Sequence, residues 1–383
     1  MLKQFFLLLF SFTLSAQVMF SGKVIDIKTK ETLTGASIYI PNTSIGTTSN
    51  FEGYFNVQLP LTTKEIVVSF MGYTTVKIPL TLTEGQNITE TIFLREANAN
   101  LEELVIRKQK ITKDWKRKYA IFKANFIGKS SLSENVEILN KEEIYFEEER
   151  NATGYVLVAN SNSPLLIKNE NTGYLMTYDL IGFTYIHTKD HEDYASYFGY
   201  LFFEDIVKKE KLNAKKTTKN RVKAYKGSLQ HFIKSVFENN FTEEGFEINQ
   251  YILKDNPDYP SEAALKIRNE RIKKEGFIKL NPLPPKKIAI LGRKYSKSDF
   301  ISEENNQQFF NFNDLIRVIY TKENPDKNYT FSLRQMSYLK IDEKIEIFEN
   351  GNYFPPTQLI AYDYMGWKKI GDALPLDYEP KKD

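Results

Sequence analysis

The first hundred residues alternate short apolar runs with turn residues. Glycine, proline or asparagine separates one run from the next, at the spacing of about 8–12 residues that is typical of small β-sandwiches. In the last run, Ile88, Ile92 and Leu94 fall on one face of an extended strand. The pattern predicts an all-β sandwich over residues 18–96. The expected strands are residues 23–25, 36–40, 54–57, 66–70, 75–78 and 88–94.

Residues 112–383 mix helical and extended periods. Trp115, Tyr119, Phe122 and Phe126 recur at spacings of four, three and four, which predicts a helix over residues 112–126 with an aromatic stripe in the core. Short runs of β-branched and aromatic residues follow and predict an antiparallel meander of four or five strands. The expected strands there are residues 144–146, 154–159, 165–167, 174–180 and 195–203.

The rest of the chain predicts two further helices, a proline-rich break and a return to strands. The helices are expected over residues 215–239 and 261–274, and the extended break over residues 282–285. The late strands are expected at residues 315–321, 330–333, 337–341, 345–348 and 358–362. The fold class is therefore mixed: an N-terminal all-β sandwich joined to an α+β domain with an antiparallel sheet over residues 112–383. Residues 97–111 form the expected linker, in which residues 101–106 are one more strand.

Four motifs follow one another in the first region. They are Gly22-Lys23-Val24-Ile25-Asp26, Leu33-Thr34-Gly35-Ala36-Ser37-Ile38, the stretch from Gly46 to Phe55, and Val68-Ser69-Phe70-Met71-Gly72-Tyr73. In this order they resemble the carboxypeptidase-regulatory-like domain. The resemblance implies a transthyretin-like sandwich, of the kind that precedes TonB-dependent outer-membrane receptors and occurs in other envelope proteins. Despite its name, the family implies no zinc site and no catalytic residues.

The second region is similar to an uncharacterised C-terminal region that follows such sandwiches in envelope proteins of the same bacteria. The residues that carry this likeness are 126–130, 164–169, Gly173-Tyr174, Asn220-Arg221, 224–228 and 374–378. The resemblance implies an order of elements and no chemistry.

The N-terminus has the pattern of an export signal. Lys3 precedes an apolar run over residues 5–14, and Ser15-Ala16 follows it, so residues 1–16 are expected to be a signal peptide cleaved after Ala16. The run is shorter than the roughly 20 residues that a membrane-spanning helix needs, and no later stretch is apolar enough for one. We expect an exported protein, in the periplasm or associated with the outer membrane of a Gram-negative bacterium.

Composition narrows the chemistry. The 383 residues include no cysteine, which excludes disulfides, thiolate metal sites and a lipid carried on cysteine. The formal charge of +3 argues against nucleic-acid binding. One local asymmetry stands out, because residues 207–226 hold nine Lys or Arg residues and a single acid, Glu210. This run is either a solvated helix face or a peripheral contact for anionic lipid or acidic glycan.

His187 and His191 are the weak candidates for a metal site. Their i, i+4 spacing would place two imidazoles on one face of a helix, as in zinc sites. Thr188 stands where the HExxH pattern needs glutamate, and the surroundings indicate a strand end and a loop. Solvated loop histidines are therefore favoured, and the sequence predicts neither a metal nor a cofactor.

A polar cluster on the predicted helix over residues 215–239 supplies the weak candidates for binding. Its members are Arg221, Tyr225, Lys226, Ser228 and His231. Ser228 and His231 lie three residues apart and have the chemistry of a nucleophile and its base. However, Gly227-Ser228 lacks the second glycine of a G-x-S-x-G elbow. The favoured interpretation is that the cluster packs the helix against the sheet or anchors a loop.

Together these observations predict an exported, non-catalytic cell-envelope protein. It would be a binding or docking module for an outer-membrane or periplasmic partner, either a protein or a glycan. One alternative is an envelope hydrolase acting on peptide or glycan, in which Ser228, His231, His187 or His191 would converge in a cleft. Another is a carbohydrate-binding module, which would carry an exposed strip of aromatic side chains.

Overall fold

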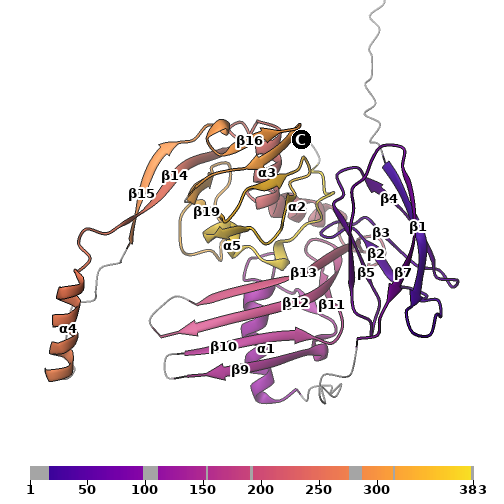
Figure 1. The fold of residues 1–383 in the computed structure, drawn as a ribbon, viewed down its shortest axis with the longest axis horizontal. Helices are drawn as coiled ribbons and strands as arrows, with labels where there is room; N and C mark the ends of the chain where they lie inside the picture. The colour runs from indigo at the N-terminus through magenta and orange to yellow at the C-terminus, as the bar shows by residue number, and fades with distance from the viewer. Residues whose placement is uncertain are drawn as a thin grey trace, which may run out of the picture. The chain divides into compact units, whose positions relative to one another are not determined.

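The computed structural model describes residues 17–97, 111–151, 154–189, 193–275, 287–313 and 315–380 (Figure 1). The chain forms two compact units, Met1–Val222 with Ile370–Asp383 and Lys223–Lys369. The second unit is thus inserted into the first. The predicted signal peptide, the strand expected over residues 101–106 and the proline-rich break at residues 282–285 lie outside the described residues. The remainder is mostly β with antiparallel sheets, as the sequence predicts for the fold class.

The first unit begins with the predicted sandwich, drawn in indigo in Figure 1. Its two sheets have the strand orders β4-β1-β7 and β3-β2-β5-β6. Side chains in β1 alternate between buried and accessible, so that Phe20 and Val24 join Ile38 and Ile66 of the other sheet in an aliphatic core. The strands are β1 (Gln17–Asp26), β2 (Ser37–Tyr39), β3 (Gly46–Thr48), β4 (Tyr54–Pro60), β5 (Glu65–Ser69), β6 (Val76–Pro79) and β7 (Asn87–Leu94).

The turn before β4 shows why the motif needs its glycine. Gly53 has a φ of 80°, and a Cβ placed there would lie 2.9 Å from the Val24 carbonyl oxygen. The Asn50 side chain fixes the same turn, because its Oδ1 accepts hydrogen bonds from the backbone N–H groups of Glu52 and Tyr54 at 3.0 and 2.8 Å. Only glycine fits this position without strain.

A six-stranded sheet forms the rest of the first unit. Its central strand, β12, pairs with β11 along its first half and with β10 along its second half, while β13 follows its other edge. The topology is therefore more branched than the predicted meander. The strands are β8 (Glu137–Ile138), β9 (Ile144–Arg150), β10 (Gly154–Ser161), β11 (Leu165–Asn169), β12 (Tyr174–Thr188) and β13 (Tyr194–Asp205), with the short helix η1 (Lys141–Glu143) before β9.

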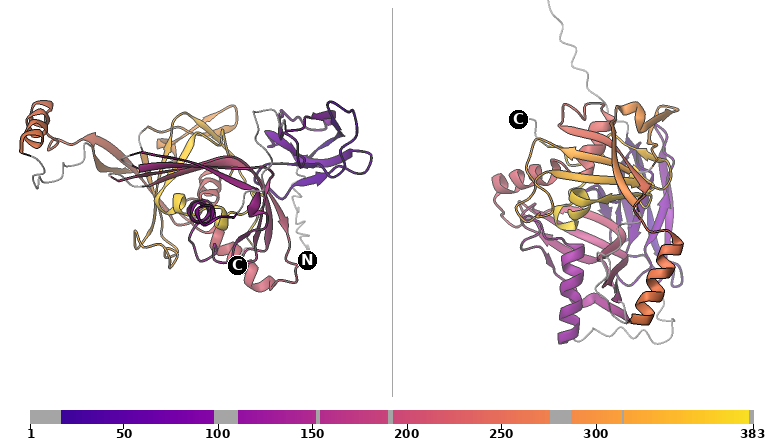
Figure 2. Two further views of the ribbon diagram at one scale, coloured as in Figure 1. Left: turned by 90° about the horizontal axis from the view of Figure 1, so that it is seen from below. Right: turned by 90° about the vertical axis from the view of Figure 1, so that its left-hand side faces the viewer.

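Helix α1 (Lys113–Phe126) packs across one face of this sheet (Figure 2). Three members of the predicted aromatic stripe, Trp115, Phe122 and Phe126, are buried, and the fourth, Tyr119, is half-buried and stacks on Trp115. The rings of Phe122 and Phe183 lie 4.8 Å apart, those of Phe126 and Tyr178 lie 5.0 Å apart, and the Trp115 indole N–H donates to the Ile144 carbonyl at 3.0 Å. The prediction that these aromatics belong to the core is confirmed.

The sandwich contacts the six-stranded sheet within the first unit. The Asn42 N–H donates to the Leu201 carbonyl at 2.6 Å, and the Phe203 N–H donates to the Thr43 carbonyl at 3.0 Å. The C-terminal segment extends this contact, because the Leu376 N–H donates to the Asn42 carbonyl at 2.8 Å. The β2–β3 turn is thus held by a strand of the sheet and by the end of the chain.

The second unit contains two sheets and an aromatic core that includes Phe232, Phe246 and Phe310. The larger sheet has the order β15-β14-β18-β19-β22 and the smaller has the order β16-β17-β20-β21. The strands are β14 (Phe246–Asp255), β15 (Lys287–Lys294), β16 (Ile301–Glu304), β17 (Gln307–Phe310), β18 (Leu315–Tyr320), β19 (Gln335–Ile341), β20 (Ile345–Ile347), β21 (Tyr353–Phe354) and β22 (Leu359–Tyr362). The helices are α3 (Leu229–Phe237), α4 (Glu262–Glu275), η2 (Lys297–Asp299) and α5 (Asp363–Trp367), and η3 (Ile370–Asp372) returns to the first unit.

Two predicted elements differ from the structure. The single helix expected over residues 215–239 is two helices, α2 (Ala214–Tyr225) and α3, because Gly227 adopts a φ of 69° between them. The strand expected over residues 330–333 is a loop, in which Phe331 is 80% exposed and Leu333 is 95% exposed. Within the described parts of the chain, no helix is both long and apolar enough to cross a membrane.

Candidate functional site

His187 lies near the end of β12 and is tied to Asp193, the residue that precedes β13. Its Nδ1 lies 2.7 Å from Asp193 Oδ1, and the Tyr185 hydroxyl donates to Asp193 Oδ2 at 2.5 Å. The Tyr185 hydrogen bond, followed by that of His187, lowers the pKa of Asp193. His191 lies outside the described residues. Among the residues that the structure does describe, no group of three His, Asp or Glu side chains could hold a metal ion.

Arg221 anchors a turn of the first unit. Its Nε donates to the Thr172 carbonyl at 2.7 Å, and its guanidinium lies 2.9 Å from Asp205 and 4.0 Å above the centre of the Tyr174 ring. The guanidinium of Arg221 therefore contacts a backbone carbonyl, a carboxylate and an aromatic ring at the same time. Arg221 therefore has the loop-anchoring role that the favoured interpretation of the cluster describes.

Ser228 and His231 are close in the chain, but they do not form a nucleophile–base pair. The Ser228 hydroxyl is the N-cap of α3 and accepts the His231 backbone N–H at 3.1 Å. The imidazole uses both of its nitrogens elsewhere, because Nδ1 accepts from the Gly227 N–H at 3.1 Å and Nε2 lies 3.2 Å from Glu244 Oε2. Neither nitrogen is available to take a proton from the serine hydroxyl.

Burial determines the charge state of His231. The side chain is 4% exposed and packs against the Tyr225 ring at 4.7 Å. Desolvation lowers the pKa of His231 to about 4, although Glu244 acts in the opposite direction. The imidazole is therefore neutral at pH 7 and serves as a packed, hydrogen-bonded part of the core.

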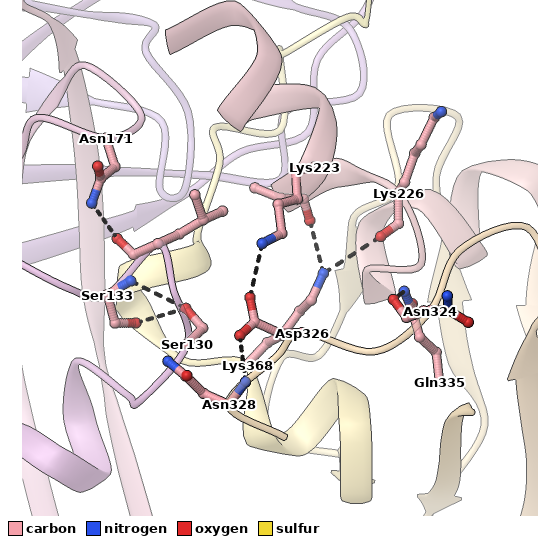
Figure 3. Close-up of polar contacts among 12 residues, drawn as sticks. Ser130, Ser133, Asn171, Lys223, Lys226, Asn324, Asp326, Asn328, Gln335 and Lys368 are labelled. Atoms are coloured by element: carbon pink, nitrogen blue, oxygen red, sulfur yellow. Dashed lines mark hydrogen bonds and ion pairs between the residues drawn. The ribbon is translucent and has the colours of Figure 1, made fainter. Parts of the chain in front are cut away.

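The C-terminal end of α2 is held by a polar network within the second unit (Figure 3). Lys368 Nζ donates to the carbonyls of Ala224 and Lys226 at 3.2 and 3.4 Å, where the helix leaves its last carbonyls without partners. Lys223 Nζ lies 3.0 Å from Asp326 Oδ2, and Lys226 Nζ lies 3.3 Å from Glu323. The predicted binding residue Lys226 thus contacts the loop that follows β18.

This loop, residues 321–334, borders a pocket with a volume of about 390 Å³. Strands β14 and β18 pair so that Glu247 lies beside Ile319 on one side of the sheet. The loop is tied at its base, because the Thr321 hydroxyl donates to the Gly245 carbonyl at 2.9 Å and Gln335 Nε2 donates to the Asn324 carbonyl at 2.9 Å. The lining residues are Glu247, Ile319, Tyr320, Thr321, Glu323, Asn324, Leu333 and Arg334.

The pocket combines charged and polar groups with an apolar rim. Glu247 and Glu323 supply carboxylates, Arg334 a guanidinium, and Asn324 an amide. Leu333, which is almost fully exposed, adds an apolar surface at the edge. This set can donate and accept several hydrogen bonds to one small polar ligand, and the volume lies within the usual range of about 300–1,000 Å³ for such sites.

Sequence reasoning missed this pocket. Glu247 and the loop over residues 321–334 belong to no motif that the sequence analysis identifies, and residues 330–333 are predicted there as a strand. One available signal was the polar, turn-rich stretch over residues 321–328, which stands between two apolar strands and is typical of a long surface loop. Glu247 lies near this loop because its strand, β14, pairs with β18, about 70 residues further along the chain.

Two exposed aromatic rings of the sandwich, Tyr54 and Phe93, are covered by lysines, whereas Phe51 is 90% exposed. Tyr54 lies on the outer face of the β4-β1-β7 sheet with Lys23 Nζ 5.0 Å from the centre of its ring, and Phe93 has Lys30 Nζ at 5.1 Å. Each lysine stem lies across an aromatic surface and its ammonium makes a cation–π contact.

Comparison with known proteins identifies one module. Residues 20–106 match the family model of the CarboxypepD_reg-like domain, which confirms the resemblance of the N-terminal motifs. No curated protein matches the chain significantly.

Three solved structures show only remote likeness. A candidate carbohydrate-binding protein from Bacteroides uniformis is 7% identical over 51% of this chain and 82% of its own, with a TM-score of 0.17. A candidate membrane-associated protein of unknown function from Bacteroides fragilis is 12% identical over 90% of this chain and 94% of its own, also with a TM-score of 0.17. A DUF3823 family protein from Bacteroides ovatus is 10% identical over 49% of this chain and 98% of its own, again with a TM-score of 0.17. These scores do not establish a shared fold.

Proposed function

We propose that the protein is an exported, non-catalytic binding protein of the Gram-negative cell envelope, in the periplasm or at the outer membrane. Two features support the location. The first is the CarboxypepD_reg-like domain over residues 20–106, a module that occurs in envelope proteins. The second is the leader-like pattern of residues 1–16, with one basic residue before its apolar run.

The polar pocket of the second unit is the observation that carries the binding role. Its carboxylates, guanidinium and amide surround a volume suited to a small polar ligand. A ligand rich in hydroxyl and amide groups satisfies both the acceptors and the donors. Fragments of envelope glycan or peptide have this chemistry, and Leu333 offers a surface for an apolar sugar face or a short side chain.

The hydrolase alternative has less support from the residues first suspected. Ser228 caps a helix, and His231 uses both ring nitrogens within the core. His187 belongs to the first unit and is paired with Asp193. Each of these side chains has a structural partner that competes with a catalytic role.

The proposal is tested by titrating the full chain with peptidoglycan fragments and neutral oligosaccharides in a calorimeter. The variants Glu247→Gln and Arg334→Gln remove one charge each from the pocket, and we expect each to weaken binding at least about tenfold, as loss of a charged hydrogen bond does. Glu90→Gln, on the exposed edge strand β7 of the sandwich, is the matched control and should bind as the native chain does.

Two results would contradict the proposal. Affinity that is unchanged in both pocket variants would exclude the pocket as the binding site. Chromatography of the recovered ligand provides the second measurement, because cleaved product would show that the protein is an enzyme.

A further inference from the structure

A lysine cluster covers the surface between β13 and the first half of α2. It consists of Lys208, Lys209, Lys211, Lys215, Lys216 and Lys219, and all six belong to the first unit. Each of the six side chains is exposed. Glu210 is the single acid between the first and the last of them. Residues 107–118 are another basic run, with seven Lys or Arg residues against Asp114, but Arg117 and Lys118 there are paired with Asp114 and Glu148.

The backbone holds these lysines within a short distance of one another. Residues 206–212 form a tight turn, in which the Glu210 N–H donates to the Ile206 carbonyl at 2.8 Å and the Leu212 N–H donates to the Val207 carbonyl at 2.9 Å. Helix α2 starts directly afterwards, with Asn213 Oδ1 accepting the Lys216 N–H at 3.0 Å. The turn and the helix start are therefore one continuous, hydrogen-bonded stretch of backbone that carries all six lysines.

The helix presents its three lysines on one side. At about 100° per residue, Lys215, Lys216 and Lys219 fall within an arc of about 100°, opposite the buried Thr217. The positive end of the helix dipole adds to the charge of Lys215 and Lys216, because both lie in the first turn of α2. The lysine side chains and the backbone at the start of α2 therefore both produce a positive electrostatic potential.

Nearby acids neutralise little of this charge. Lys209 Nζ lies 3.0 Å from Glu204, and Glu210 contacts Lys168 at 3.2 Å, outside the cluster. In the described portion of the chain, the other five lysines make no ion pair within 4.0 Å. This is unlike Arg221, which follows in the same helix and is fixed by Asp205. The five ammonium groups are left facing solvent.

We infer that the lysine cluster binds the anionic head groups of a lipid surface. All six cations are lysines, which act as mobile point charges, whereas recognition of one discrete phosphate or carboxylate favours the rigid fork of arginine. The six lysines lie on an exposed turn and helix face. This arrangement suits a broad surface over which negative charges are distributed, such as the head groups of anionic lipids. The inference rests on the proposed envelope location and deepens it, but it does not depend on the pocket.

The test measures sedimentation of the full chain with phosphatidylcholine vesicles that contain or lack phosphatidylglycerol. At low salt we expect binding to the anionic vesicles alone, and loss of that binding at about 1 M salt, where the Debye length is about 3 Å. The triple variant Lys215→Gln/Lys216→Gln/Lys219→Gln should bind about 10- to 100-fold more weakly, given the usual contribution of each lysine near a charged membrane.

A matched control separates the cluster from net charge. Lys113→Gln/Lys116→Gln/Lys141→Gln removes three exposed lysines from elsewhere in the first unit and should bind vesicles as the native chain does. Equal loss in both triple variants would overturn the inference, and so would tighter binding to a soluble acidic polysaccharide than to the vesicles. The pocket variant Glu247→Gln should leave vesicle binding unchanged, so failure of the pocket and failure of the cluster remain distinguishable.

Discussion

The sandwich and the second unit are both rich in strands, but they build their cores differently. The sandwich core is largely aliphatic, and Phe20 and Phe55 are the two aromatic rings in its central cluster. The core of the second unit contains six phenylalanines and a tyrosine, and the neutral imidazole of His231 packs at its edge. Aliphatic alternation gives a regular sandwich, whereas large rings from strands, a helix and loops fill an irregular volume between the sheets of the second unit.

Truncation of one core residue in each region should have the largest effect. Phe232→Ala and Leu59→Ala each remove a fully packed side chain, and we expect losses of about 3–5 and about 2–5 kcal/mol in the free energy of unfolding of the affected region. Hydrogen exchange followed by mass spectrometry should show faster exchange in the second unit for Phe232→Ala and in the sandwich for Leu59→Ala. Phe331→Ala, on an exposed loop, is the control. Equal exchange changes in both regions would mean that the two cores unfold as one.

Acid should weaken the second unit through His231. The native pKa is about 4, below the unfolded value of about 6.5, so the unfolded state binds the proton more readily. The neutral His231 contributes its full share of the free energy of unfolding above about pH 6.5. This share, up to roughly 3 kcal/mol, is lost as the pH falls toward 4. Urea titrations at several pH values check this, with His231→Gln as reference. The native chain should lose stability relative to the variant on acidification, and a constant difference would contradict the assignment.

Removal of a helix cap should have the smallest effect, and it should be similar in the two units. Ser228 caps α3 and Thr112 caps α1, each through a 3.1 Å hydrogen bond from a backbone N–H. Ser228→Ala and Thr112→Ala should each lower the free energy of unfolding by about 1 kcal/mol in urea titrations. If Ser228→Ala instead abolished turnover of an envelope substrate while leaving stability intact, Ser228 would be a nucleophile.

Sequence patterns predicted the elements whose signal is local. The sandwich strands follow from alternation, and α1 follows from the spacing of Trp115, Phe122 and Phe126. The break between α2 and α3 was missed because helical periodicity continues across Gly227. A Cβ at Gly227 would lie 2.1 Å from Gln335 Oε1, so the close approach that requires this glycine comes from a distant strand.

The candidate site was less predictable than the fold. Arg221 and His231 are polar and close together in the sequence, but their partners are backbone groups and acidic side chains of their own units: Arg221 donates to the Thr172 carbonyl, and His231 accepts from the Gly227 N–H. The pocket depends on the pairing of β14 with β18, which places Glu247 near a loop that ends at Arg334. Long-range strand pairing has no local pattern, and therefore a single sequence does not reveal such a site.

The return of the chain to its first unit sets an order of assembly. The Gly371 N–H donates to the Ile127 carbonyl at 2.9 Å, Asn169 Nδ2 donates to the Gly371 carbonyl at 2.9 Å, and Asp377 pairs with Ser44. A chain that is synthesised from its N-terminus makes the sandwich and the six-stranded sheet long before these last residues exist. Residues 223–369 of the inserted unit are also synthesised before them. Until then the Asn42 carbonyl lacks its native partner, so a nascent or truncated chain holds its sandwich less firmly than the finished protein does.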